Sequence, residues 1–254
     1  MNARWLPAAT LIGLLVAWEI LVRVSHIPAY TLPAPSLIGQ TLWHNLPSLI
    51  GSWWFTLKIT LGALSLACAG GVLIAAMFAL FPLLEIAFFP VAIILQVTPV
   101  VAIAPLMLIY IGSTTVALLL CAWLVAFFPI LSNTLQGLRA ADPNLKDLFR
   151  LYGASRGQRL RLLLAPSALP YFLAGLKISG GLSLIGAVTG EMVAGAAGRE
   201  TGLASRILEA SFRTETPKMF AALTLLVITG VLVFLTFNLL SRRLLGHWHP
   251  TERS

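Results

Sequence analysis

The stretch Thr115–Leu138, TVALLLCAWLVAFFPILSNTLQGL, decides the fold class, because it is predominantly apolar and carries no charged side chain. A helix needs about 20 mostly apolar residues to cross a bilayer. Backbone N–H and C=O groups find no water inside lipid, so only helices and closed β-barrels can span it. The run is far longer than a barrel strand, and its apolar residues do not alternate with polar ones. It therefore predicts a membrane-spanning helix.

Five further apolar runs extend this pattern over most of the chain. They are Trp5–Val24, Trp53–Leu80, Ile86–Ile111, Tyr171–Ala194 and Met219–Leu240. Of the 254 residues, 58% are hydrophobic and only 10% are charged, whereas a soluble domain is about a quarter charged. The sequence therefore predicts an all-α, polytopic transmembrane helical bundle of about six spans, in which Pro90, Pro99 and Pro105 interrupt the third run.

Lysine and arginine residues are divided unequally between the two sides that six spans create. Six spans put both termini and the polar loop 139–170 on one side, which holds ten of these residues, and the other side holds five. Cytoplasmic loops carry the excess of positive charge, so both termini and the loop are predicted to be cytoplasmic. The net charge of +8 is therefore interpreted as membrane topology rather than as nucleic-acid binding.

We expect a single transmembrane domain over residues 1–254. Its parts are a first span at 1–24, a periplasmic loop with a short amphipathic helix at 25–52, a core of five spans at 53–240 that includes the loop 139–170, and a cytoplasmic tail at 241–254. Tryptophan favours the membrane boundary, which assigns 25–52 to a surface. The first span is interpreted as retained, because only Arg4 precedes it and no clear cleavage site follows; cleavage as a signal peptide is the alternative.

Two short helices are predicted within the loop 139–170. Asp142 followed by Pro143 is typical of a helix start, and Gly153 of a helix end. Between them, one apolar face at positions i, i+3, i+4 and i+7 is formed by Leu145, Leu148, Phe149 and Tyr152. Ser155 with Gln158 is a capping-box pattern, which predicts a second helix that runs to Pro166.

A helix of about ten residues is marginal alone in water, so this apolar face must pack against something. One interpretation packs it on its own bundle or in the lipid headgroup layer, with the basic residues facing anionic lipid. The other makes it a docking helix for a cytoplasmic partner. The residues alone leave both interpretations open.

The same segment resembles the cytoplasmic EAA loop of binding-protein-dependent ABC importer permeases. The order is a short helix, a glycine, nine residues and an apolar-x-x-Pro ending, and the glycine and proline match at Gly153 and Pro166. Asp147–Phe149 replaces the Glu-Ala-Ala triplet, and Ala165 replaces the leucine before the proline. The likeness is closest to the nitrate, sulfonate, taurine and pyrimidine-precursor branch.

Further stretches carry that likeness to the branch. They are LPAPS at Leu32–Ser36, FFPILSNTLQGL at Phe127–Leu138, PSALPYFLAGLKIS at Pro166–Ser179, and the region from Glu191 to Gly202-Leu203. Lys177 stands where arginine is usual, and Ala204 where a glycine is expected.

The resemblance implies a permease subunit that moves a small anion, sulfonate or heterocyclic vitamin precursor into the cytoplasm by ATP-driven alternating access. It implies a bacterial inner-membrane location, two copies of a cytoplasmic ABC ATPase, a periplasmic or lipid-anchored solute-binding protein, and a second permease copy in a homodimer. ATP and Mg²⁺ would be used by the ATPase, and this chain would bind no cofactor or metal. The implied ATPase-coupling residues are Leu145, Asp147, Leu148, Phe149, Arg150, Tyr152, Gly153, Ser155 and Pro166.

Candidate pathway and packing residues lie in the fifth run. Lys177 and Glu191 are ionisable groups in or near a span, which are often functional. On one helix they would be about 21 Å apart, too far to pair. Snorkelling of Lys177 and interhelical pairing of Glu191 are the alternatives. Three glycines are expected to pack helices, within one subunit or across a dimer, and they are Gly181, Gly186 and Gly190.

Catalytic function finds little support in the sequence. Gly153–Gly157 matches G-x-S-x-G, but no strand precedes it, as a nucleophile elbow would require. There is no Walker-type loop, and Cys68 and Cys121 are interpreted as buried free thiols. An ion-coupled secondary transporter and an intramembrane enzyme are the alternative functions, and the substrate is not indicated.

Overall fold

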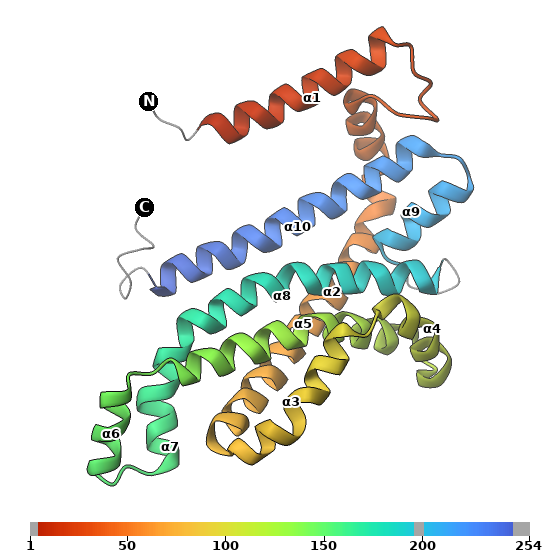
Figure 1. The fold of residues 1–254 in the computed structure, drawn as a ribbon. Coiled ribbons are helices and arrows are strands. Elements are labelled where there is room, and N and C mark those ends of the chain that lie inside the picture. The colour runs from red at the N-terminus through yellow and green to blue at the C-terminus, as the bar shows by residue number, and fades with distance from the viewer. Residues whose placement is uncertain (1–4, 196–200, 246–254) are drawn as a thin grey trace. The chain divides into compact units, whose positions relative to one another are not determined.

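The computed structural model describes residues 5–195 and 201–245, and the regular structure within these ranges is entirely helical (Figure 1). The helices are α1 (Leu6–Val24), α2 (Pro35–Leu80), α3 (Pro82–Val97), α4 (Val100–Ile111), α5 (Thr114–Arg139), α6 (Pro143–Leu151), α7 (Arg156–Arg159), the π-helix η2 (Leu160–Leu164), α8 (Ala165–Ala194), α9 (Leu203–Phe212) and α10 (Thr216–Leu245). The prediction of an all-α bundle is confirmed.

Five helical stretches among the described residues are long and apolar enough to cross a membrane. They are Leu6–Val24, Pro35–Leu80, Thr114–Arg139, Arg156–Ala194 and Thr216–Leu245. Helices α3 and α4 meet at an angle of 97°, and counting this bent pair as one span gives six. The bend lies at Thr98 and Pro99, both of which have extended backbone, because proline restricts the residue before it and has no N–H to donate. Pro90 and Pro105 remain inside helices.

Helix α2 begins earlier than the apolar pattern indicated. The sequence predicted a surface loop and a separate short helix before a span starting at Trp53, but the structure has one helix of 46 residues from Pro35. Proline is well tolerated at the first helical position. Pro47 lies inside the helix, so a proline-rich composition did not interrupt it.

The second loop helix also continues further than predicted. The expectation that it ends at Pro166 is wrong, because α7, η2 and α8 follow one another without a break to Ala194. The π-turn gives the physical reason: Ala165 N–H donates to Leu160 C=O, one residue further back than in an α-helix. The hydrogen-bond register has therefore already changed before Pro166, which lacks a donor, and the chain stays helical.

The chain divides into two compact units. The first consists of Met1–Phe55 and Gly195–Ile228, and the second of Thr56–Ala194 and Thr229–Ser254. In the first unit, the Glu19 carboxylate of α1 accepts hydrogen bonds from Ser36 N at 3.0 Å and Ser36 Oγ at 2.7 Å. A carboxylate at a helix N-terminus is favourable because it bonds unpaired N–H groups and faces the positive end of the dipole. Glu19 therefore fixes the start of α2.

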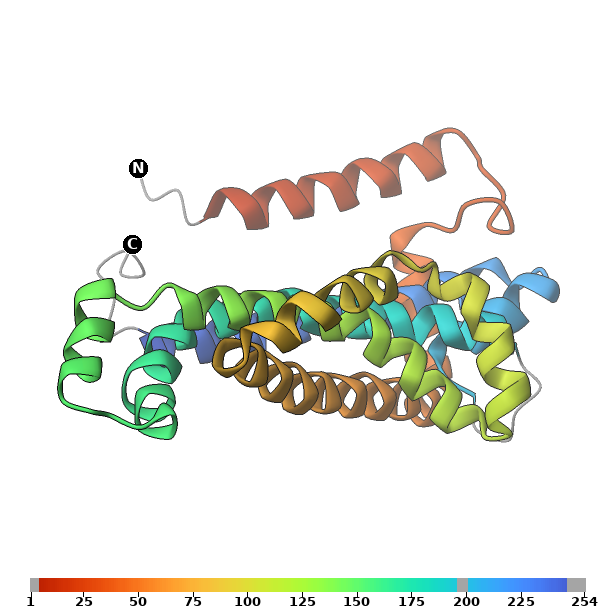
Figure 2. The same ribbon diagram turned by 60° about the horizontal axis from the view of Figure 1, so that its bottom comes forward.

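Helices α5 and α8 form the centre of the second unit, where they pack extensively against each other. Ser179 Oγ of α8 donates to Ala126 C=O of α5 at 2.7 Å, which satisfies a buried hydroxyl. The α6–α7 hairpin projects at one end of this pair, and Figures 1 and 2 both show α6 and α7 side by side there. The predicted coupling loop therefore connects the end of α5 directly to the start of α8.

Candidate functional site

Helix α6 has the local structure that its sequence predicted. The Asp142 side chain accepts from Asn144 N at 2.8 Å, and Pro143 is the first helical residue. After Tyr152, Gly153 adopts φ of 66°, and Ala154 N donates back to Phe149 C=O at 2.9 Å. The Ser155–Gln158 capping box then starts α7, with Ser155 N donating to Gln158 Oε1 at 2.8 Å. The predicted caps and the glycine stop are confirmed.

The apolar residues of α6 face in two directions. Phe149 points to the bundle, where it packs on a buried cluster that includes Leu135 and Leu138 of α5 and Leu164 of η2. Three other predicted face residues stay uncovered: Leu145 and Leu148 are each 43% exposed, and Tyr152 is 83% exposed. The helix thus has one aromatic anchor and an apolar outer surface.

Leu151 belongs to that outer surface, although the predicted face omitted it. It is 85% exposed, the most exposed leucine of the described residues, and lies beside Tyr152 at the tip of the hairpin. The i, i+3, i+4 spacing selected Leu145, Leu148 and Phe149 because it assumes that one stripe is buried on one partner. Leu151 could have been identified from its position three residues after Leu148, which places both leucines on the outer surface of a helix whose inner side is held by Phe149.

Polar contacts connect α6 to α5, and α5 in turn to α3. Lys146 Nζ donates to the C=O of Arg139, the last residue of α5, at 2.8 Å. The Arg139 guanidinium forms an ion pair with Glu85 of α3. Cations near a helix C-terminus are favourable, because the last carbonyls lack helical partners. Asp147 and Arg150 are exposed and separated by 3.8 Å, so their ion pair adds little.

Gly153 requires the left-handed backbone, which gives a local test with a matched control. Replacing Gly153 by alanine is expected to destabilise the hairpin by about 1 kcal/mol, because an L side chain is strained at φ of 66°. Gly157 of α7 has open space around a built Cβ and no positive φ, so Gly157→Ala should be neutral or stabilising. Amide hydrogen exchange of α6 would measure both changes; equal protection in the two variants would contradict this role.

Glu191 and Lys177 both lie on α8, as the sequence predicted. Glu191 is only 1% exposed, and Thr56 Oγ1 of α2, also 1% exposed, donates to Glu191 Oε1 at 2.8 Å. Lys177 is half-buried and lies fourteen positions earlier on the same helix, about 21 Å away along its axis. A buried carboxylate in a span needs such hydrogen bonds. In this conformation Glu191 connects α2 to α8 inside the second unit.

The three predicted packing glycines differ in what they face. A Cβ on Gly186 would lie 2.7 Å from Ala122 Cα, and one on Gly190 would lie 2.9 Å from Leu118 Cδ2, so both permit close contact between α8 and α5. Gly181 has nothing within 4 Å of a built Cβ. Two of the glycines therefore pack within this chain, and the third lies on an open side of α8.

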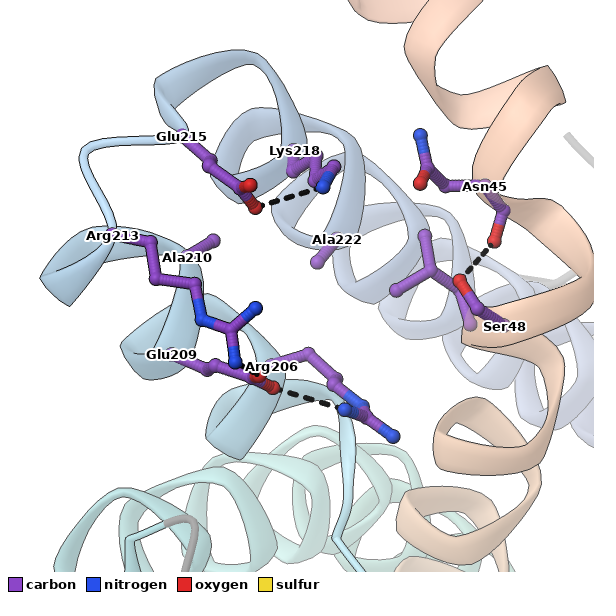
Figure 3. Close-up of a pocket in the computed structure, with 10 residues that line it drawn as sticks. Asn45, Ser48, Arg206, Glu209, Ala210, Arg213, Glu215, Lys218 and Ala222 are labelled. Carbon is purple, nitrogen blue, oxygen red and sulfur yellow. Dashed lines mark hydrogen bonds and ion pairs between the residues drawn. The ribbon is translucent and has the colours of Figure 1, made fainter.

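A polar pocket of about 160 Å³ in the first unit was not predicted (Figure 3). Glu209 of α9 is paired with Arg206 at 2.9 Å and with Arg213 at 2.8 Å, and Glu215 is paired with Lys218 at 2.8 Å. Asn45 and Ser48 of α2 complete its polar lining. The available signal was the spacing of Arg206, Glu209 and Arg213 along one helical face. The count of lysines and arginines for membrane topology had used Arg206 and Arg213 only as positive charges.

Residues 67–251 match the family described as "Binding-protein-dependent transport system inner membrane component". The chain belongs to this family. It is therefore a multi-pass membrane protein and the permease component of an ABC importer for small solutes, as the resemblance of the coupling loop and neighbouring stretches predicted. The loop 139–170, which is predicted to couple the permease to its ATPase, lies inside the matched range.

Curated relatives agree with this assignment of the permease component. The chain is 36% identical to the riboflavin transport system permease protein RibX of Chloroflexus aurantiacus, over 95% of this chain and 89% of the relative. It is 32% identical to the formylaminopyrimidine transport permease protein ThiX of Halalkalibacterium halodurans, over 94% of each chain. It is 28% identical to the putative aliphatic sulfonates transport permease protein SsuC of Bacillus subtilis, over 95% and 87%.

A solved structure shows the same fold. The permease component aligns with an amino acid ABC transporter structure at a TM-score of 0.64 and 18% identity, over 80% of this chain and 97% of the other. The family consists of transport components, so the prediction that this chain is not an enzyme is confirmed. Among the described residues, no group of three potential metal ligands occurs.

Proposed function

We propose that this permease component works as a homodimer that imports a small heterocyclic solute by ATP-driven alternating access. Each α6 would bind one copy of a cytoplasmic ABC ATPase, and a solute-binding protein would deliver the solute on the opposite side of a bacterial inner membrane. ATP and Mg²⁺ would be used by the ATPase, and this chain would bind no cofactor.

The observation that carries the proposal is that α6 has two different sides, one exposed and apolar and the other attached to the bundle. Leu145, Leu148, Leu151 and Tyr152 leave an apolar surface on the hairpin, while Phe149 and Lys146 hold the helix to the bundle. Exposed apolar patches with charged neighbours are typical of protein interfaces. Because the anchor contacts α5 and the start of the α8 helix, movement of a bound partner would be transmitted to the central helix pair.

The charged pocket of the first unit supports a second contact, with the solute-binding protein. Its ion pairs are solvent-accessible, and Arg213 in particular is 64% exposed. Charges at the edge of an interface chiefly set the rate and specificity of association rather than the affinity. The span count predicts α9 on the membrane side opposite to α6, where such a protein would bind.

The proposed orientation predicts the side from which two exposed residues can be labelled. In a chain with Cys68 and Cys121 replaced by alanine, Tyr152→Cys should react with a membrane-impermeant maleimide only in inverted vesicles. Phe212→Cys, which is similarly exposed at the end of α9, should react only in spheroplasts. Labelling of Tyr152→Cys from outside would overturn the placement of α6 in the cytoplasm.

Reconstituted transport tests the function itself. Two relatives above 30% identity are named for riboflavin and formylaminopyrimidine transport, which supports a heterocyclic solute. Proteoliposomes containing the permease, its ATPase and its binding protein should accumulate such a heterocycle only when ATP is present on the α6 side. Accumulation driven by an ion gradient without ATP would support the secondary-transporter alternative. Preference for taurine or nitrate would refute the proposed substrate class.

A further inference from the structure

A basic pocket of about 220 Å³ lies where α6 and α7 meet the ends of α2, α3 and α5. Its charged lining residues are Glu85, Arg139, Lys146, Arg150 and Arg159, and its apolar ones are Phe78, Ala79, Pro82, Leu138 and Leu164. All of them belong to the second unit. Four cations therefore converge on one small space that contains a single carboxylate.

Among the residues that the structure describes, the positive charge lining this pocket exceeds the negative charge. Glu85 is paired with Arg139, and the Lys146 ammonium contacts a backbone carbonyl rather than an acid. Arg150 forms a long, exposed ion pair with Asp147. Among the described residues, no ion pair involves Lys146 or Arg159. The pocket therefore has the charge and the N–H donors to bind an anion, and a phosphate is the anion that arginine recognises best with paired hydrogen bonds.

An apolar groove of about 320 Å³ adjoins the pocket. It is lined by Ile74, Met77, Phe78, Leu84, Phe88, Val91, Ala92, Leu95, Trp123, Phe127 and Leu131. Phe78 belongs to both linings, and Leu84 of the groove directly precedes Glu85 of the pocket. The groove follows α3 and α5 into the apolar part of the chain, away from the helix ends that form the pocket. An anion site and a hydrocarbon site are thus continuous.

We propose that this pair of hollows binds one anionic phospholipid, with its phosphate in the basic pocket and an acyl chain in the groove. A free phosphate would account for the cations but not for the apolar groove, and a zwitterionic lipid would account for the groove but not for the excess charge. Basic pockets between spans on the cytoplasmic side bind anionic headgroups in other membrane proteins. The assignment to the cytoplasmic leaflet rests on the proposed orientation of α6.

The lipid would stabilise the position of the coupling hairpin. Lys146 and Arg150 belong to α6, Arg159 to α7, and Arg139 to the end of α5, so one phosphate would connect three helices. Phe149 holds α6 from its apolar side, and the headgroup would hold it from its charged side. The coupling helix would therefore be ordered by the composition of the membrane as well as by the chain itself.

Lipid retention by the isolated permease tests the proposal, because it requires neither ATPase nor transport. Native mass spectrometry of the purified protein, exchanged into mixed phosphatidylglycerol and phosphatidylcholine, should show preferential retention of one phosphatidylglycerol per chain, and high salt should weaken it. The double variant Lys146→Gln with Arg159→Gln is expected to retain it about tenfold less well. Arg161→Gln removes the same charge two residues beyond Arg159, outside the pocket, and should retain it normally.

The groove and the pocket can be tested separately. Val91→Phe adds bulk to the groove and should reduce phosphatidylglycerol retention while leaving the cations in place. If inorganic phosphate or glycerol phosphate displaces the bound species as well as whole lipid does, and Val91→Phe has no effect, the site binds a free anion and the proposal fails. Equal retention of phosphatidylcholine, or a dimer whose second copy excludes all lipid from the groove, would also overturn it. A failure of import with normal lipid retention would count against the proposed function alone.

Discussion

Replacing Leu148 by aspartate is expected to abolish binding of the ATPase subunit while the permease remains inserted and folded. Leu148 lies on the outer surface of α6 and is 43% exposed, so its loss removes little packing inside the chain. At an interface, the same side chain would enter a partner's groove, and aspartate would bury an unpaired charge there. Central interface residues cost roughly 2–4 kcal/mol when removed, which corresponds to about 30-fold to 1000-fold weaker binding.

Co-purification with a tagged ATPase would measure this effect, with size-exclusion chromatography as the check on folding. Leu148→Met keeps the apolar character and approximate volume of the side chain, so it should bind the ATPase nearly as well as the native chain. Normal co-purification of Leu148→Asp would show that α6 does not dock the ATPase by this surface.

The anchor residue should behave differently from the docking surface. Phe149→Ala removes an aromatic ring from the cluster with Leu135 and Leu138 but leaves Leu148 and Tyr152 exposed. ATPase binding should then persist while ATP hydrolysis and transport become uncoupled. This contrast separates the side of α6 that receives a partner from the side that is attached to the bundle.

Introducing valine at Gly186 is expected to prevent α5 and α8 from packing. Its Cβ would lie 2.7 Å from Ala122 Cα and 3.1 Å from the Cys121 carbonyl oxygen, so backbone rather than a flexible side chain would have to move. Overpacking in a close-packed core typically costs about 1–3 kcal/mol, and a backbone clash falls at the upper end of this range or beyond it. The variant should show a lower melting temperature and a reduced folded yield in detergent.

Gly181→Val is the matched control for that substitution. It places the same β-branched side chain on the same helix, where nothing lies within 4 Å of a built Cβ. Its melting temperature should therefore be close to that of the native chain, and equal melting of the two variants would contradict the packing role of Gly186. Loss of dimers in Gly181→Val without loss of stability would assign the open side of α8 to contact between subunits.

Much of the fold could be predicted because membrane insertion leaves simple signals in sequence. Thr115–Leu138 and the C-terminal run each satisfy the length that a span requires, and the structure has α5 and α10 there. The α6–α7 hairpin was also predictable, since Asp142, Gly153 and Ser155 act through hydrogen bonds to backbone within a few residues. Hydrogen bonds between residues close in sequence leave patterns that a short stretch of sequence contains.

Other features depended on contacts that no short pattern contains. The hydrogen bond between Thr56 and Glu191 joins residues 135 positions apart, and nothing near Glu191 identifies its donor. The inward position of Phe149 depends on the cluster formed by α5 and η2. The charged pocket around Glu209 required α2, α9 and α10 to come together. These parts of the candidate sites became visible only from tertiary structure.

The π-turn at Leu160–Leu164 sets the rotational phase between two surfaces that are otherwise fixed independently. The capping box fixes the start of α7, while Gly186 and Gly190 fix which face of α8 meets α5. In regular α-helix one additional residue would turn everything beyond it by about 100° around the helix axis, whereas a π-turn takes up that residue in its wider turn. A single-residue deletion at the π-turn is therefore expected to restore regular α-helix and keep the two surfaces in phase, whereas a deletion in α8 before Gly186 would rotate them apart.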